Sequence, residues 1–378
     1  IMKKIKLTCA HAIVKYLISQ KILIDGKKEP LFPGVFAIFG HGNVTCLGEA
    51  LEAVRDVMPT WRGQNEQSMG LAAVAFAKAS RRRQIMVATS SIGPGCTNFL
   101  TAAGTAHSNR LPVLFLSGDT FSNRLPDPVL QQVEHFQDPS MTVADAFKSC
   151  TRFWDRITHP AQLMVSLPQA VATMIDPATS GPAFIALPQD IQGYAYDYPT
   201  SFFKKRVWSI ERQPPRKDRI CEAIGLLKAA KKPFIIAGGG IHYSESWSEL
   251  LAFAEEFKIP VGETHAGRGA ILNASEILMG GTGHLGTPAA GRMAEEADLV
   301  ICIGTRLHDF VTGSNSAFQN PNVKFVSINV NSRDAYKLGA LPILADAKLS
   351  LLALIKEGRR TKILSNTKWI NKANVERL

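Results

Sequence analysis

The sequence predicts an α/β protein made of two successive doubly wound parallel-sheet domains. Short apolar runs alternate with longer stretches of helical periodicity along most of the chain. The alternation stops near residue 195, where proline, aromatic and charged residues gather, and it resumes near residue 220. Because strands that alternate with helices form a parallel sheet covered by helices on both faces, we expect one such sheet on either side of the interruption.

The first domain is expected over residues 1–195. Its apolar runs end near Gly or Ser, which is typical of buried strands that lead into turns. We expect strands at 35–40, 84–90, 112–118 and 181–190, and helices at 7–20, 48–58 and 68–80.

Residues 196–219 are expected to form a linker on the surface, and the second domain follows over residues 220–355. The second domain is expected to have strands at 232–241, 297–307 and 323–330, and a helix that leads into a strand at 246–261. Residues 356–378 are polar and show no fold of their own. We expect this tail to lead to a further domain that the chain does not contain.

The composition is typical of a globular protein of the cytoplasm. The chain has 378 residues, of which 46% are hydrophobic, and its mean hydropathy is +0.01. Its six cysteines are scattered without a CxxC pair, which argues against a disulfide framework or a zinc site. No apolar run approaches the roughly 20 residues of a membrane span, so we expect no membrane partner.

The formal net charge of +11 raises the possibility of nucleic-acid binding. The one dense cluster, Arg81 to Arg83, follows a predicted helix and suits the negative end of that helix. The other basic residues are dispersed and lack interleaved aromatic residues. We therefore expect no nucleic-acid partner; an acidic partner surface is the alternative that balances the charge.

Three stretches of the first domain could carry chemistry, and two of them, 39–47 and 89–99, follow predicted strands at the edge where ligands bind open parallel sheets. They are FGHGNVTCL (39–47), QNEQSMG with Glu66 (64–70), and TSSIGPGCTNF (89–99). Each is a weak signal alone. The glycines of such a turn more often serve only its backbone conformation. A glutamate at a helix start is favoured by the helix dipole without any catalytic role.

Together, FAIFGHGN, QNEQSMGLAAVAFAKAS and TSSIGPGCTNFLTAAGTAHSNRLPVLFLSGD resemble the pyrimidine-binding domain of thiamine-diphosphate enzymes of the acetolactate synthase type. In the second half, KPFIIAGGGI and ADLVICIGTRLHDF are similar to the middle domain of that family. The resemblance covers about residues 5–355.

The resemblance implies a role for each of six residues. Glu66 would hydrogen-bond N1′ of the cofactor's aminopyrimidine, since a partly buried carboxyl can share a proton with a ring nitrogen. His41 would lie beside the reacting carbon and relay protons; the alternative is a loop histidine bonded to backbone. The expected wall of the pyrimidine site is Ser91, Pro94 and Asn98, unless these only shape a turn and a helix cap, and Gln137 matches an active-site glutamine.

Other motifs carry no assigned role. The glycines at 238–240 suggest a nucleotide site, but they lack GxGxxG spacing, and we expect no nucleotide there. His107 is interpreted as structural, whereas His284 and His308 could line a cleft of the second domain.

Two departures from the family pattern narrow the resemblance. The usual glycine–x–proline–glycine turn is here Gly40 to Asn43, and Gln64-Asn65 replace the arginine-histidine pair before the glutamate. With HFQDPSMTVADAF and TRFWDRITHPAQL, these features are similar to a branch that opens a cyclic dione by hydrolysis in inositol breakdown. The resemblance thus implies a C–C bond hydrolase. The alternatives are a carboligase or decarboxylase, or a non-catalytic binding protein that keeps the fold.

The family binds the diphosphate of thiamine diphosphate and Mg²⁺ through a third domain with a Gly-Asp-Gly motif, which is not in the sequence. We therefore expect the chain to be the first two domains of a longer enzyme, with no metal site of its own and no activity alone. The resemblance further implies a homo-oligomer, a dimer or tetramer, with the site at a subunit interface.

Overall fold

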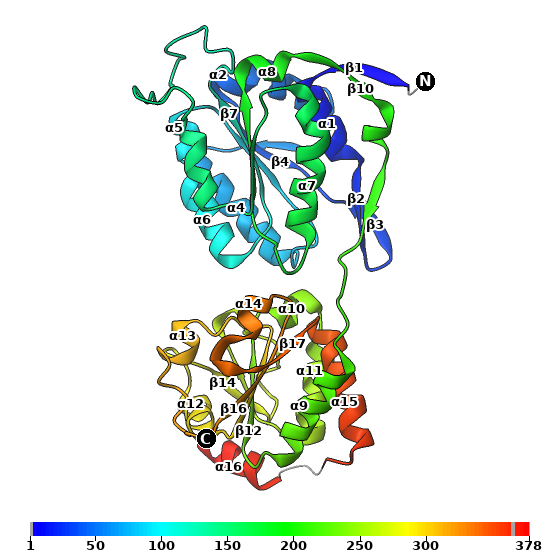
Figure 1. Ribbon diagram of the computed structural model, residues 1–378, viewed down its shortest axis with the longest axis vertical. Coiled ribbons are helices and arrows are strands. Elements are labelled where there is room, and N and C mark those ends of the chain that lie inside the picture. The colour runs from blue at the N-terminus through cyan, green and yellow to red at the C-terminus, as the bar shows by residue number, and fades with distance from the viewer. Residues whose placement is uncertain (1–2, 364–366, 378) are drawn as a thin grey trace. The chain divides into compact units, whose positions relative to one another are not determined.

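The computed structural model describes residues 3–363 and 367–377. The chain forms two compact units, one up to Glu211 and one from Arg212 onward. Each contains one six-stranded sheet in which all strands run parallel (Figure 1). The predicted fold class, two successive doubly wound parallel-sheet domains, is therefore confirmed.

The sheet of the first unit has the strand order β5-β4-β6-β7-β9-β8. Its strands are β4 (Val35–Ile38), β5 (Thr60–Arg62), β6 (Val87–Ser90), β7 (Leu114–Asp119), β8 (Phe153–Arg156) and β9 (Ala183–Pro188). Every residue of β6, β7 and β9 is buried. These strands read as continuous apolar runs because helices cover both faces of the sheet.

Four helices form the two covering layers of the first unit. On one face lie α1 (Cys9–Ser19) and α7 (Leu163–Ile175), and on the other lie α4 (Glu66–Ala79) and α6 (Leu100–Asn109) (Figure 1). A Cβ on Gly70 of α4 would approach Ala102 of α6 to 2.5 Å. The small side chains of both helices therefore allow their backbones to pack closely.

The expected helix at 48–58 is shorter in the structure. The chain after β4 coils through α2 (Gly40–Asn43), a π-helical turn (Val44–Gly48) and α3 (Glu49–Glu52), and then gives way to turns. Further short elements of this unit are α5 (Pro94–Thr97), η2 (Val143–Ser149), η3 (Pro160–Gln162) and α8 (Gln189–Gly193).

The expected linker over 196–219 is largely part of the first unit. β10 (Ala195–Pro199) pairs antiparallel with β1 (Lys4–Thr8). After η4 (Thr200–Phe203), β11 (Arg206–Trp208) pairs with β2 (Gln20–Ile24), which pairs with β3 (Lys27–Pro30). Tyr198 and Trp208 of this stretch are buried, and Tyr196, Phe202 and Phe203 pack partly buried against the same core, so the segment contributes to the core of the first unit instead of lying on its surface.

The sheet of the second unit has the strand order β14-β13-β12-β15-β16-β17. Its strands are β12 (Pro233–Ala237), β13 (Val261–Glu263), β14 (Leu278–Gly281), β15 (Leu299–Ile303), β16 (Lys324–Asn329) and β17 (Leu341–Leu344). The helices α9 (Lys217–Ala229), α11 (Trp247–Phe257) and α15 (Ala347–Arg360) pack together on one face, with α12 (Pro288–Glu296) on the other (Figure 1). Short helices α10 (Gly240–Ser244), η5 (His265–Gly267), α13 (Asp309–Thr312), α14 (Ser332–Ala335) and η6 (Lys337–Gly339) complete it.

Most of the described part of the expected structureless tail at 356–378 is helical, except for the turn at 361–363. α15 continues to Arg360, and α16 (Thr367–Arg377) packs against α12 and β14. Trp369, Ile370 and Ala373 are buried, and the Trp369 indole donates to the Pro233 carbonyl at 2.9 Å. Residues 364–366 and 378 of the expected tail, and residues 1–2 of the expected first domain, lie outside the described residues. In the described part of the chain, no helix has the length and apolar character to cross a membrane.

Candidate active site

The candidate site lies at the point where the strand order of the first sheet reverses. β4 is followed in sequence by β5 on one side and, after a crossover, by β6 on its other side. Ligands of open parallel sheets bind outside the carboxyl ends of the strands at such a point. The structure has a hollow of about 580 Å³ there. It is lined by Ile38, Gly40, Glu66, Ser91, Pro94, Gly95, Thr97, Asn98 and Gln131.

Glu66 is half-buried at the first position of α4. The Asn65 side chain caps this helix by accepting the backbone N–H of Ser68 at 3.0 Å. The Glu66 Oε2 atom accepts a hydrogen bond from Asn98 Nδ2 at 2.8 Å. The carboxylate is thus held by a neutral amide from a neighbouring loop, at the positive end of a helix.

The turn after β6 forms the second wall of the hollow. Gly93 has a φ of +58°, and a Cβ there would lie 1.8 Å from the Gln131 carbonyl oxygen, so a larger residue would be strained and would displace the Gln131 backbone. Pro94 starts α5, a place where its missing N–H costs nothing. Ser91 and Asn98 flank this turn, and with Pro94 and Glu66 they line one hollow.

The turn after β4 forms the third wall. Gly40 has a φ of +52°, and a Cβ there would come within 2.5 Å of the Ser91 Cβ. The Gly42 backbone N–H donates to Ser91 Oγ at 3.3 Å. The glycines of this turn therefore allow the close approach of two chain segments, as the sequence suggested.

His41 belongs to this turn but does not line the hollow. Its carbonyl oxygen accepts a hydrogen bond from Gln189 Nε2 at 3.3 Å. The ring atom Nε2 is buried and has no hydrogen-bond partner among the described residues. A buried polar atom without a partner is uncommon and marks His41 as a residue that needs a further explanation.

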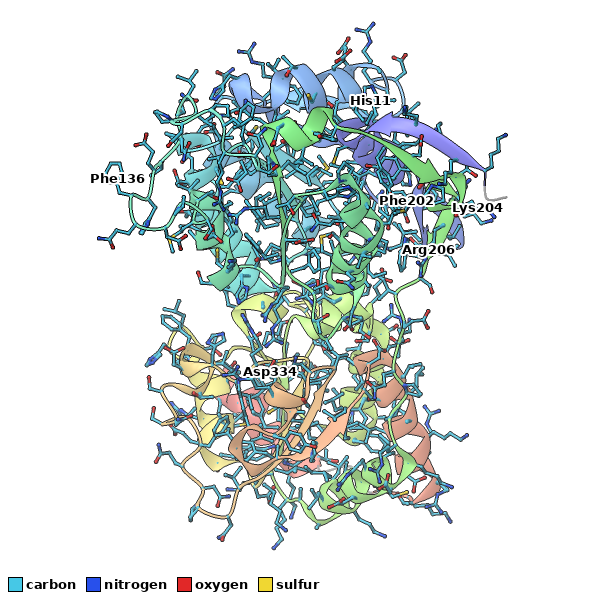
Figure 2. All side chains as sticks on the ribbon, turned by 45° about the horizontal axis from the view of Figure 1, so that its top comes forward. His11, Phe136, Phe202, Lys204, Arg206 and Asp334 are labelled. Carbon is cyan, nitrogen blue, oxygen red and sulfur yellow. The ribbon has the colours of Figure 1, made fainter. Side chains whose placement is uncertain are left out.

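The 120–142 loop covers one side of the hollow and differs from the expectation. Gln131 lines the hollow, whereas Gln137 is exposed and does not. The neighbouring Phe136 is 95% exposed and points away from the unit (Figure 2). Nothing in the sequence identified Gln131, because its place depends on the long-range contact between its backbone and Gly93.

Both ends of this loop are anchored by ionised groups. At the first end, the Asp190 carboxylate accepts hydrogen bonds from the Ser122 backbone N–H at 2.9 Å and its hydroxyl at 2.8 Å. Arg156 links the two ends, since it forms ion pairs with Asp119, just before the loop, at 2.8 Å and with Asp145, just after the loop, at 2.6 Å.

The contacts of Arg156 also shift its own pKa and the pKa of Asp145. Burial raises the pKa of the Asp145 carboxyl, but hydrogen bonds from Lys148, the Thr142 backbone and Arg156 outweigh it and lower the pKa to about 2. Burial lowers the pKa of the Arg156 guanidinium, but Asp119 and Asp145 raise it above its usual value. Asp145 and Arg156 therefore both stay charged near neutral pH.

The corresponding place in the second unit is closed by glycines. A Cβ on Gly238 would lie 2.3 Å from the Gly304 carbonyl oxygen, and one on Gly240 would lie 2.5 Å from the Gly304 Cα. The turns after β12 and β15 therefore pack directly on one another at the point where the strand order reverses. This contact gives the glycines at 238–240 a packing role. That no nucleotide binds there stays a prediction.

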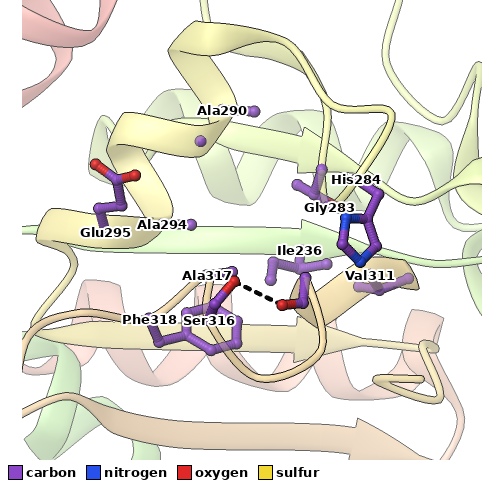
Figure 3. Close-up of a pocket in the computed structure, with 13 residues that line it drawn as sticks. Ile236, Gly283, His284, Ala290, Ala294, Glu295, Val311, Ser316, Ala317 and Phe318 are labelled. Atoms are coloured by element: carbon purple, nitrogen blue, oxygen red, sulfur yellow. Dashed lines mark hydrogen bonds between the residues drawn. The ribbon is translucent and has the colours of Figure 1, made fainter. Parts of the chain in front are cut away.

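The remaining histidines occupy different surroundings. His284 lines a pocket of about 200 Å³ formed mainly by small and apolar residues between α12 and the 311–318 segment (Figure 3). His308 is about half-exposed and lies 3.5 Å from Asp309. His107 lies on α6, where burial and then Arg152 and Arg110 lower its pKa.

The described residues offer no metal site. No group of three or more His, Cys, Asp or Glu side chains within 3–363 and 367–377 could hold a metal ion. All six cysteines carry free thiols.

Two protein-family models match this chain. Residues 32–141 match the N-terminal TPP binding domain of thiamine pyrophosphate enzymes, and residues 220–354 match the central domain of these enzymes. The first match contains Glu66 and all other residues that line the hollow.

Curated relatives give a consistent result. The chain is 49% identical over 356 residues to a 3D-(3,5/4)-trihydroxycyclohexane-1,2-dione hydrolase of Bacillus cereus, and 49% identical over 359 residues to one of Clostridium tetani. These alignments cover 94% and 95% of this chain but 55% and 56% of the relatives, so the chain spans about half the length of the proteins it matches. The chain therefore belongs to the thiamine pyrophosphate enzymes, of which it has the N-terminal TPP-binding domain and the central domain.

Proposed function

We propose that this chain provides the pyrimidine-binding half of the active site of a thiamine-diphosphate-dependent hydrolase. The reaction is the opening of the ring of 3D-trihydroxycyclohexane-1,2-dione to 5-deoxy-D-glucuronate in myo-inositol degradation. The observation that carries the proposal is the placement of Glu66, held by Asn98 in the hollow that Ser91 and Pro94 share. The named activity of the relatives supports the choice of substrate.

The hollow fits the aminopyrimidine ring of the cofactor. The Glu66 Oε2 atom is engaged by Asn98, whereas Oε1 lies beside Gly95, where a Cβ would come within 3.2 Å of it. Gly95 therefore keeps space free next to a carboxylate oxygen that can share a proton with a ring nitrogen. Ser91 and Pro94 form the wall of this space.

Three residues of the chain have roles in the proposed reaction. Thiamine diphosphate, when bound, supplies the electron sink for breaking the C–C bond. Glu66 holds and moves the proton at the pyrimidine nitrogen, and Asn98 keeps its carboxylate oriented. In this proposal His41, in the turn that contacts Ser91, relays a proton near the substrate, although its side chain does not line the hollow in this structure.

The diphosphate and Mg²⁺ require residues beyond those described here. No described cluster of acidic, His or Cys residues could hold the metal. In our proposal a further domain, from another subunit of a homo-oligomer, completes the site, and this chain alone is inactive. The exposed apolar residues of the 120–142 loop support such a contact. They are Leu125, Leu130, Val133, Phe136 and Met141.

The proposal is tested by completing the site. We would fuse this chain to the remaining part of the Bacillus cereus relative and measure turnover of the cyclic dione and of pyruvate. Ring opening of the dione with little pyruvate consumption supports the proposal. Carboligation or decarboxylation of pyruvate instead would assign the chain to the acetolactate synthase type of reaction. Titration of the unfused chain with thiamine diphosphate and Mg²⁺ should give little heat.

The role of Glu66 is tested in the same fusion. Glu66→Gln should lower turnover by about 10²–10⁴-fold because it removes the proton-sharing carboxylate. Glu49→Gln is the matched control, since Glu49 is also the first residue of a helix but is exposed. Equal losses in both variants would contradict a catalytic role for Glu66.

A further inference from the structure

Gln192, at the end of α8, is the centre of a buried hydrogen-bond network behind the candidate site. It is 1% exposed. Its Nε2 atom lies 3.0 Å from the Gly42 carbonyl oxygen, 3.0 Å from Asn43 Oδ1 and 3.1 Å from the Leu187 carbonyl oxygen. One amide nitrogen thus joins the turn after β4 to the end of β9.

The orientation of this amide is fixed by its surroundings. Three oxygen acceptors surround the position of Nε2, so only the NH₂ group can occupy it. Oε1 is buried on the other side without a partner among the described residues. A carboxylate in place of the amide would present an oxygen to three oxygens.

The network continues from Gln192 to the walls of the hollow. Asn43 is fully buried, and its Nδ2 donates to the Ser90 carbonyl at 2.6 Å and to Thr89 Oγ1 at 3.0 Å. The end of β6 is therefore tied to the turn, one residue before Ser91. Because a Cβ on Gly40 would lie within 2.5 Å of the Ser91 Cβ, a shift of the turn must move both walls of the hollow.

The same helix also holds His41. Gln189, three residues before Gln192, donates to the His41 carbonyl at 3.3 Å. Gln189 Oε1, like His41 Nε2 and Gln192 Oε1, is buried without a described partner. Two consecutive carbonyls of the turn, at 41 and 42, are thus fixed by two glutamines of one short helix.

We propose that Gln192 is a positioning residue of the active site. It fixes the conformation of the Gly40–Asn43 turn and thereby places His41 and the Ser91 wall relative to Glu66, with Gln189 in a supporting role. That this placement matters for catalysis rests on the proposed function. The placement itself can be measured without cofactor or turnover.

The experiment uses the chain with isotope-labelled histidine and amide nitrogen. In Gln192→Met and Gln192→Glu we expect the ring signals of His41 to move and amide hydrogen exchange of the 40–43 turn to accelerate at least tenfold. The ring signals of His284, which lies in the other unit, should stay in place.

Gln20→Leu is the matched control. Gln20 is also 1% exposed in the first unit, with its amide bonded to Tyr16 and Ser19 and its oxygen accepting from the Trp208 indole. This variant should lower the melting temperature as much as Gln192→Met while leaving the His41 signals and the exchange of the turn within twofold of the wild type. An equal response of His41 in the control would overturn the proposal, as would an unchanged His41 in both Gln192 variants.

Gln189→Leu keeps the test open if the Gln192 variants fail to fold. Gln189 is half-buried and its amide makes one hydrogen bond, so we expect the fold to persist and the His41 signals to move in the same direction by a smaller amount. Unchanged signals would contradict the proposal. In the active fusion, Gln192→Met should lower kcat at least tenfold at unchanged KM, which Gln20→Leu should not do. A fusion that is inactive as wild type overturns the proposed function and leaves the histidine result standing.

Discussion

The two units place their glycine-rich turns at the same topological position and use them differently. In the first unit, the turns after β4 and β6 meet through Gly40 and Ser91 and leave a hollow beside Glu66. In the second unit, the turns after β12 and β15 meet through Gly238, Gly240 and Gly304 and fill the equivalent crevice with backbone.

The difference shows that a glycine-rich turn at a strand end does not by itself define a site. What distinguishes the first unit is a carboxylate at a helix start, an amide that orients it and a buried network that fixes the turn. The second unit has the same kind of sheet and turns, but its glycines serve the contact between the two turns. Four measurements test this difference between the two units.

The largest effect is expected from Gly304→Ala. Gly304 has a φ of +61°, and a Cβ added there would lie 2.5 Å from the Gly240 Cα. This is a backbone atom of a closely packed turn, which cannot move away as a flexible side chain could. We expect a loss of roughly 4 kcal/mol in the free energy of unfolding of the second unit, measured by denaturation followed with hydrogen exchange. In the control Gly225→Ala, the new methyl meets open space inside α9 and should stabilise by up to about 1 kcal/mol. A tolerated Gly304→Ala would mean that the crevice is open to ligands.

Arg156→Leu should cost the first unit about 3 kcal/mol. The substitution leaves the Asp119 carboxylate, 3% exposed, without its ion pair. Chemical denaturation measures the loss. Arg55→Leu breaks an ion pair that is exposed on both sides and should change stability by less than about 1 kcal/mol. Similar values for both variants would show that the anchor of the 120–142 loop is not a buried pair.

Gly93→Ala should cost about 1–2 kcal/mol, less than Gly304→Ala although its clash is shorter. The Cβ would meet the Gln131 carbonyl, which belongs to an exposed loop that can move away. We expect faster proteolytic cleavage within 120–142 and little change in exchange of the sheet. A loss as large as that of Gly304→Ala would show that the loop is as rigid as the closed crevice of the second unit.

The smallest effect is a pH dependence from Asp145. Since its folded pKa is lowered to about 2 from an ordinary value of 3.8, its stabilising contribution is present above about pH 4 and is lost as the pH falls toward 2. We expect a loss of roughly 1 kcal/mol over that range, because partial solvent screening reduces the effect. Thermal unfolding of Asp145→Asn should lack this step. The step should be confined to the first unit; its persistence in the variant would contradict the assignment.

The sequence predicted the central strands of both sheets, because buried parallel strands read as apolar runs. It did not predict β1, β10 and β11. In β1, lysines alternate with apolar residues, and β10 and β11 lie among prolines and charges that read as a linker. Strands outside the central sheet have one solvated side, so only their long-range pairing defines them. Likewise, α16 packs through Trp369, Ile370 and Ala373 within a polar stretch, which gives too weak a helical pattern.

The candidate site was predictable where a local motif carries it. Glu66, Ser91, Pro94 and Asn98 lie in motifs at strand ends, and the structure brings them together. Gln131 and Gln192 were not predictable, since each acts through contacts to residues far away in sequence. Gln137, expected from a motif, is exposed because the course of the 120–142 loop depends on its anchors instead of its composition.

The pairing of β1 with β10 has a consequence for synthesis of the protein. Lys4 pairs with Pro199, and β2 pairs with β11 at Arg206–Trp208. β1 therefore has no partner, and β2 has only β3, until roughly 200 residues have been made, which takes about 10–40 s at common translation rates. During that time the first unit is incomplete, because β10 and β11 have not yet been made. The nascent first unit therefore leaves β1 unpaired until β10 has been made.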